Sequence, residues 1–209
     1  MLFRKLIVAA ATSFAALAAV AAPVITPAYT TTGINVLGEV NAAEYTLDMT
    51  FKLDDLSGWR KLVDFNNRAD DAGLYVYWDQ LAFATTSDDL VWGSGTAGTG
   101  IGTRLTLTRD NTGLVSAYIN GAFQLSFNDV SNVAVFGTTG GQTSAWILAD
   151  DVQFDSREQA AGTLTSFKVY NHALTANEIA AVPEPESMAL VAAGLMTALT
   201  LSRRRQNKA

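Results

Sequence analysis

Apolar and polar residues alternate without interruption along Tyr45–Leu53. The odd-numbered positions are all apolar, and the even-numbered positions are Thr, Asp or Lys. A period of two over the nine residues predicts a β-strand with one buried face. Other segments rich in strand-forming residues, bounded by turn residues, predict further strands at 60–65, 74–78, 80–85, 103–109, 114–119, 123–127, 133–136, 145–148 and 164–170.

Turn and capping residues mark the ends of these strands. Asn120-Gly121 is the pair preferred in a two-residue hairpin turn. The stretch Gly93–Gly102 contains five glycines and predicts a loop. All four prolines lie outside residues 28–182, as suits a sheet that uses every backbone N–H. Thr175 and Glu178 form a capping box, which predicts one short helix near residue 180.

These elements together predict an all-β fold. Short antiparallel strands at this spacing are typical of a β-sandwich or jelly roll. We expect its core to contain the inward-facing apolar residues Leu47, Met49, Phe51, Leu105, Leu107, Phe123, Leu125 and Phe127.

The first 21 residues have the three parts of a secretory signal peptide. Arg4 and Lys5 precede an apolar stretch at 6–20, and Ala19-Val20-Ala21 provides small residues at the cleavage position. We expect cleavage after Ala21 and export of the remaining chain. The alternative is a retained anchor helix, for which an apolar stretch of about fifteen residues is short.

A second apolar stretch lies at 188–201, near the other end of the chain. It follows Val182-Pro183-Glu184-Pro185-Glu186-Ser187 and precedes Arg203-Arg204-Arg205. The prolines and acids predict an extended, exposed handle before the apolar helix. A helix of this length rises only about 21 Å, against a hydrocarbon core of about 30 Å. The arginines would hold its end in the cytoplasm.

This order of proline-acid motif, short apolar helix and basic tail resembles the PEP-CTERM sorting signal of Gram-negative, exopolysaccharide-producing bacteria. The resemblance covers residues 182–205 and implies that an exosortase cuts at Pro183-Glu184-Pro185. It also implies a transient membrane anchor and a final location at the cell surface or in the extracellular matrix. A permanent C-terminal anchor is the alternative.

The composition between the two ends excludes several classes of function. Residues 23–182 contain 8 Lys and Arg against 18 Asp and Glu, a net charge of −10. A nucleic-acid-binding domain needs a basic face, so we expect no nucleic-acid partner. The chain has no Cys and one His, His172, which excludes disulfide scaffolds, thiol catalysis and sites that need several histidines.

Two segments of this region resemble laminin-G-like, concanavalin A-like domains. Residues 105–127 contain two strands around a turn, the second ending in Tyr118-Ile119-Asn120-Gly121. Residues 161–182 contain a strand followed by Tyr170-Asn171-x-Ala173-Leu174 and then Glu178-Ile179. The resemblance implies a laminin-G-like domain at 28–182. Domains of this family bind glycans, proteins or calcium.

The same sandwich also carries glycosidases, which need two carboxylates flanking the scissile bond. In laminarinase-type enzymes these come from a Glu-x-Asp-x-(x)-Glu strand. The glutamates of this region, Glu39, Glu44, Glu158 and Glu178, lie in no such motif. We therefore expect a non-catalytic, exported protein that binds extracellular polysaccharide. A structural matrix component without a specific ligand is the alternative, and a glycosidase-like enzyme ranks below both.

Tyr75, Tyr77 and Trp92 are the candidate sugar-binding residues, because aromatic rings offer faces on which sugars stack. If Leu74, Val76 and Trp78 face the core, alternation directs Tyr75 and Tyr77 to the exposed face. Trp92 lies beside the glycine-rich stretch. The alternative for each ring is packing within the sandwich.

Clustered carboxylates are the candidate calcium ligands. Asp150 and Asp151 directly follow a predicted strand, and Asp155 and Glu158 lie downstream. Asp70-Asp71 and Asp88-Asp89 are weaker alternatives. Aspartate is also common in solvated turns that bind no metal.

Overall fold

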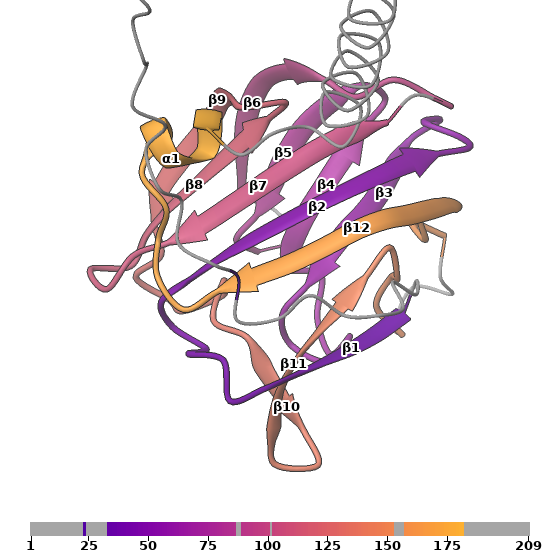
Figure 1. Ribbon diagram of the computed structural model, residues 1–209. Coiled ribbons are helices and arrows are strands. Elements are labelled where there is room, and N and C mark those ends of the chain that lie inside the picture. The colour runs from indigo at the N-terminus through magenta and orange to yellow at the C-terminus, as the bar shows by residue number, and fades with distance from the viewer. Residues whose placement is uncertain (1–22, 24–32, 87–88, 101, 153–156, 182–209) are drawn as a thin grey trace, which may run out of the picture.

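The computed structural model describes residue 23 and residues 33–86, 89–100, 102–152 and 157–181. These residues form two antiparallel sheets packed face to face, which confirms the predicted β-sandwich (Figure 1). Within these residues, no helix is both long enough and apolar enough to cross a membrane. The predicted signal peptide and the predicted sorting segment from Val182 onward lie outside the described residues.

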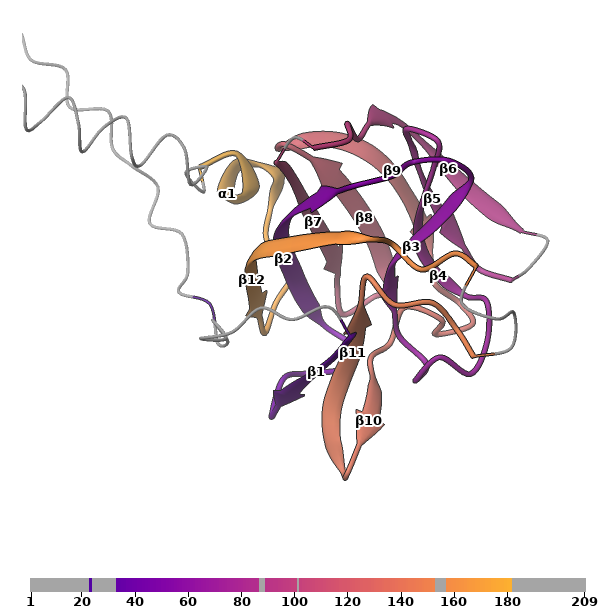
Figure 2. The same ribbon diagram turned by 90° about the vertical axis from the view of Figure 1, so that its right-hand side faces the viewer.

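One sheet has five strands, in the order β12 (Gly162–Tyr170), β2 (Tyr45–Leu53), β7 (Thr103–Arg109), β8 (Leu114–Ile119) and β9 (Ala122–Asn128). The other has the order β1 (Gly33–Gly38), β11 (Gln142–Ile147), β3 (Trp59–Asp64), β4 (Gly73–Tyr77), β5 (Gln80–Ala84) and β6 (Leu90–Thr96), with β10 (Gly137–Thr139) also paired to β11. The β10–β11 hairpin projects beyond the sandwich (Figure 2). The helix α1 spans Ala176–Ala181.

The inner faces of the two sheets form one core. Six of the predicted core residues are at most 3% exposed: Leu47, Met49, Phe51, Leu105, Leu107 and Leu125. Phe127 is half-buried and packs on Phe83 of the facing sheet, with 4.7 Å between ring centroids. Alternation along β2 and β7 therefore identified the buried face correctly.

Phe123 does not lie in the core, contrary to the prediction. Ala117 of β8 pairs with Leu125, but Tyr118 pairs with Phe123, so that Gln124 is an extra residue in β9. A β-bulge of this kind reverses the side-chain alternation. Phe123 therefore points outward, is 55% exposed and packs edge-on against Tyr118.

The glycine-rich stretch predicted as a loop is in part a strand, because β6 runs through Gly93 and Gly95. A Cβ atom on Gly93 would lie 3.2 Å from the Cβ of Gln124 in β9, and one on Gly95 would overlap the amide of the same side chain. Glycine within a strand often marks such a close approach. These two glycines let the edges of the two sheets meet.

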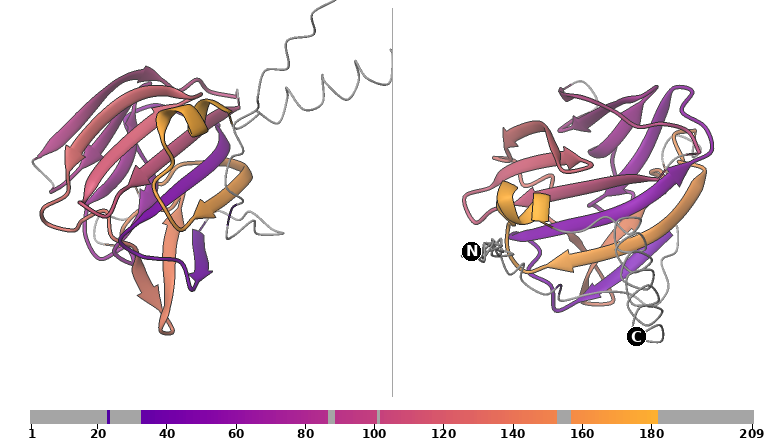
Figure 3. Two further views of the ribbon diagram at one scale, coloured as in Figure 1. Left: turned by 60° about the vertical axis from the view of Figure 1, so that its left-hand side comes forward. Right: turned by 45° about the horizontal axis from the view of Figure 1, so that its top comes forward.

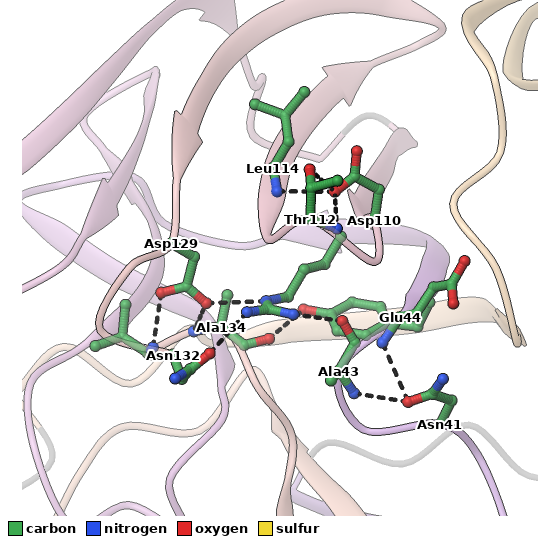
Figure 4. Close-up of polar contacts among 12 residues, drawn as sticks. Asn41, Ala43, Glu44, Asp110, Thr112, Leu114, Asp129, Asn132 and Ala134 are labelled. Atoms are coloured by element: carbon green, nitrogen blue, oxygen red, sulfur yellow. Dashed lines mark hydrogen bonds and ion pairs between the residues drawn. The ribbon is translucent and has the colours of Figure 1, made fainter.

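The predicted strand at 133–136 is instead a turn held by a buried ion pair, seen in Figure 4. The Asp129 carboxylate accepts hydrogen bonds from the amides of Val133 and Ala134, at 2.8 and 3.1 Å. Arg109 Nε donates to the same carboxylate at 2.9 Å. The amides of the turn are satisfied by a side chain, so this segment needs no strand partner.

One end of the outer face of the five-stranded sheet is covered by α1 and the segment that leads into it (Figure 3). Asp48 of β2 forms a buried ion pair with Arg104 of β7, and Arg104 Nη1 also donates to the carbonyl of Ile179 at 3.1 Å. The predicted capping box is present, with Thr175 and Glu178 each accepting from the other's backbone N–H. On the polar face of β2, Thr46 and Asp48 are thus buried, whereas Lys52 at the other end of the strand is exposed.

Candidate functional site

The outer face of the other sheet carries the candidate aromatic residues. Leu74 and Val76 of β4 are buried in the core, so Tyr75 and Tyr77 point to the outer face, as expected. Trp78 does not face the core. It occupies the β4–β5 turn with a φ of 57° and is 56% exposed, because the chain reverses one residue earlier than the alternation implies.

Four rings gather on this face. Trp59 of β3 pairs in register with Tyr77, and their centroids lie 4.4 Å apart. Trp92 of β6 reaches over β5 to within 5.6 Å of Trp59, and Tyr75 meets Trp59 edge-on at 5.8 Å. Trp59 was not predicted from the sequence, although its register with Tyr77 follows once the β3–β4 pairing is known.

Small residues beneath the rings leave a cleft. Ala82 lies between Tyr75 and Trp92 in the strand register, and Ala84 lies between Gly73 and Leu90. A methyl group or a hydrogen atom fills little space above the sheet. The result is a cleft of about 220 Å³ whose described lining residues are Trp59, Asp71, Tyr75, Ala84, Leu90 and Glu158.

Tyr75 forms a wall of the cleft rather than the exposed stacking surface that was expected. It is only 2% exposed, and its hydroxyl group donates to Asp71, 2.9 Å from Oδ1 and 3.0 Å from the backbone carbonyl. Burial and the Asp71 carboxylate raise the pKa of Tyr75 well above its usual range, so the hydroxyl stays protonated. Tyr77 and Trp92 are more accessible, and Trp92 is 43% exposed.

Two carboxylates, Asp71 and Glu158, border the cleft. Burial raises the pKa of Glu158 to about 7, and the negative charges of Asp71, Asp150 and Asp151 add to the effect. Lys61 opposes it only in part.

Lys61 is fully buried beneath this face. Its ammonium group lies 2.9 Å from the Asp64 carboxylate, 3.0 Å from the Asp70 carbonyl and 5.3 Å from the centre of the Tyr75 ring. A Cβ atom on Gly73 would lie 2.9 Å from Lys61 Cε, so glycine makes room for the lysine side chain. This ion pair supports the strands under the cleft.

Asp150 positions Glu158 through the backbone. Both residues Asp150 and Asp151 are fully buried. The Asp150 carboxylate accepts hydrogen bonds from the amide of Asp151 at 2.9 Å and from the amide of Glu158 at 2.8 Å. Its two oxygens therefore hold the backbone of Asp151 and of Glu158, and Arg68 Nε donates to the Asp150 carbonyl.

The predicted calcium ligands are only partly placed. Asp155 lies outside the described residues. Within the described ranges, no three carboxylate or imidazole groups are arranged to hold a metal ion. The Asp150 oxygens are already hydrogen-bonded to backbone amides, so the residues seen here do not assemble a calcium site by themselves, and calcium binding stays a prediction.

The fold agrees with the match to a known family. Residues 27–180 match the laminin-G model of the concanavalin A-like lectin/glucanase superfamily. The chain belongs to this superfamily. Residues 181–205 match the PEP-CTERM protein-sorting motif, which confirms both resemblances seen in the sequence. None of the curated proteins matches the chain.

Solved structures similar to this domain share its fold at low sequence identity. The carbohydrate-binding module CBM40 of a Ruminococcus gnavus sialidase, bound to α2,3-sialyllactose, superposes with a TM-score of 0.56 at 13% identity, over 78% of this chain and 100% of the module. A Bacteroides ovatus protein provisionally classed as carbohydrate-binding has a TM-score of 0.54 at 15% identity, over 73% and 44% of the two chains. A Trypanosoma rangeli sialidase has a TM-score of 0.50 at 20% identity, over 68% of this chain and 22% of the enzyme. The chain thus spans less than half of the latter two proteins.

Proposed function

We propose that this protein is an exported, non-catalytic polysaccharide-binding protein that uses the aromatic cleft of the seven-stranded sheet. The observation that carries the proposal is the cluster of Trp59, Tyr77 and Trp92, in which Trp59 also lines the cleft bordered by Asp71 and Glu158. Aromatic faces cover the apolar face of a sugar ring, and carboxylates accept hydrogen bonds from its hydroxyl groups. The carbohydrate-binding modules among the similar structures support the same function.

The sorting motif at 181–205 implies export and processing at the membrane in a Gram-negative bacterium. We infer that the C-terminal helix anchors the protein only until an exosortase cuts near Pro183-Glu184-Pro185. The domain would then reach the cell surface or the extracellular matrix, where polysaccharide is abundant. The buried contact of Arg104 with the Ile179 carbonyl keeps the folded domain intact up to the start of this segment.

Binding to polysaccharide purified from the producing bacterium tests the proposal. Isothermal titration of the protein should show saturable binding that Trp92→Ala weakens at least about tenfold, which corresponds to about 1.4 kcal/mol. Phe123→Ala is the matched control, because Phe123 is an exposed ring on the other sheet, 55% exposed against 43% for Trp92, and it should bind like the unchanged protein. Absence of saturable binding would favour the structural matrix component instead.

Hydrolysis must be measured in the same experiment, because the cleft contains two carboxylates and a glycosidase also uses two. We expect no release of reducing ends from the bound polysaccharide over many hours. Release that disappears in Glu158→Gln would show that the protein is an enzyme.

A further inference from the structure

We propose that the cleft selects uncharged sugar residues and rejects sugars that carry a carboxylate or another anionic group. This inference rests on the proposed function, because it names the class of sugar bound at the same site. It follows from the charges that border the cleft and from the absence of a cation among its described lining residues.

The charged groups that line the cleft are both acidic. Asp71 and Glu158 belong to the lining, whereas no Lys or Arg does so among the described residues. An anionic sugar is usually held by an arginine fork or an ammonium group. Here it would instead meet two carboxylates at the contact surface.

Two basic groups of β3 are already paired with other acids. Lys61 is fully buried, with its ammonium group over the Tyr75 ring, and is paired with Asp64. Arg60, on the same strand, is paired with Asp55. Neither can turn toward a ligand without leaving an acid unpaired, so these two cations are not free to neutralise an anionic sugar.

The two carboxylates are suited to hydroxyl donors. No described residue donates a hydrogen bond to the Glu158 carboxylate, and Asp71 receives one only from the Tyr75 hydroxyl. The backbone N–H of Glu158 is held by Asp150, so the side chain is anchored at the cleft edge with its oxygens available. Sugar hydroxyl groups can supply the missing donors, and a carboxylate on the sugar cannot.

The surroundings strengthen this preference. The negative charges of Asp150 and Asp151 act on Glu158 together with that of Asp71, and the positive charge of Lys61 opposes them. Residues 23–182 also carry a net charge of −10, which slows the approach of any polyanion. Both the contact groups and the longer-range field therefore disfavour acidic polysaccharides.

The test compares two sets of immobilised oligosaccharides of matched length. One set contains neutral hexoses and N-acetylhexosamines, and the other contains uronate and sialate residues. We expect binding to the neutral set at least about tenfold tighter than to the acidic set. Glu158 has a pKa of about 7, so its carboxyl group becomes negatively charged between pH 5.5 and pH 8.5. The titratable and charged groups that face it are Asp71, Asp150, Asp151, Lys61 and Tyr75. The preference for neutral over acidic oligosaccharides should therefore be larger at pH 8.5 than at pH 5.5.

The double variant Asp71→Asn/Glu158→Gln should reduce this discrimination at least about tenfold. The control Glu39→Gln/Asp54→Asn removes the same charge from two exposed positions away from the cleft and should keep it. If acidic oligosaccharides bind as tightly as neutral ones and Trp92→Ala weakens both, the charge selection is wrong while the proposed function stands. If neither set binds, the proposed function itself fails.

Discussion

The raised pKa of Glu158 predicts that the protein loses stability as the pH rises from about 4.5 to about 7. In this range the folded state keeps a proton on Glu158 that the unfolded state has already lost. The free energy of unfolding therefore falls with increasing pH. The stability linked to this proton is fully present below the unfolded pKa and is lost as the pH rises through the folded pKa. Glu158→Gln cannot ionise and should lack this part of the pH dependence.

The size of the effect follows from the structure. A pKa that moves from 4.5 to about 7 sets a ceiling of about 3.4 kcal/mol, at about 1.36 kcal/mol per pKa unit. The carboxylate borders a cleft that solvent enters, so screening reduces the expected value to about 1–2 kcal/mol. We expect the unchanged protein to lose this amount, relative to Glu158→Gln, between pH 4.5 and pH 8.

Urea denaturation at a series of pH values measures the difference directly. Trp59 and Trp92 lie near the cleft and report unfolding by fluorescence. Glu39→Gln, which removes an exposed carboxylate, controls for the general loss of one negative charge. If the unchanged protein and Glu158→Gln show parallel curves of stability against pH, the described environment of Glu158 is wrong.

Three further predictions concern other parts of the chain. Asp48→Ala should cost about 3–5 kcal/mol of unfolding free energy, because it leaves Arg104 buried beside α1 without its carboxylate; a loss below about 1 kcal/mol in denaturant titration would contradict this. If residues 153–156 complete a calcium site, millimolar Ca²⁺ should raise the Tm and Asp151→Ala should abolish the increase, whereas identical melting curves with Ca²⁺ and with chelator would dispose of the site. Mass spectrometry of the surface and secreted fractions should find chains that end within 182–186, and recovery of 188–209 still joined to the domain would indicate a permanent anchor.

Local signals in the sequence determined much of the fold. The alternation along β2 fixed which face is buried, because a strand has a period of two and one side of it faces the core. Asn120 and Gly121 both have positive φ, at 50° and 78°, as their hairpin turn requires. The capping box at Thr175 places the start of α1 within one turn.

Features that depend on neighbouring strands were decided only by the tertiary structure. The exposed position of Phe123 results from a bulge in the pairing of β8 with β9, which no periodicity within β9 reveals. Composition indicated a loop at Gly93 and Gly95, but these glycines lie in β6, which pairs with β5, and their lack of side chains makes room for Gln124 of the other sheet.

The candidate site is one of the features that only the tertiary structure decided. Tyr77 and Trp92 were identified as aromatic candidates, yet Trp59 and the two bordering carboxylates, Asp71 and Glu158, join them from distant parts of the chain. Their proximity depends on the order of strands in the sheet and on alanines that leave space above it. A sequence specifies which side chain each strand presents, whereas the pairing of strands decides which of those side chains meet, because contacts across a sheet join residues that are far apart along the chain.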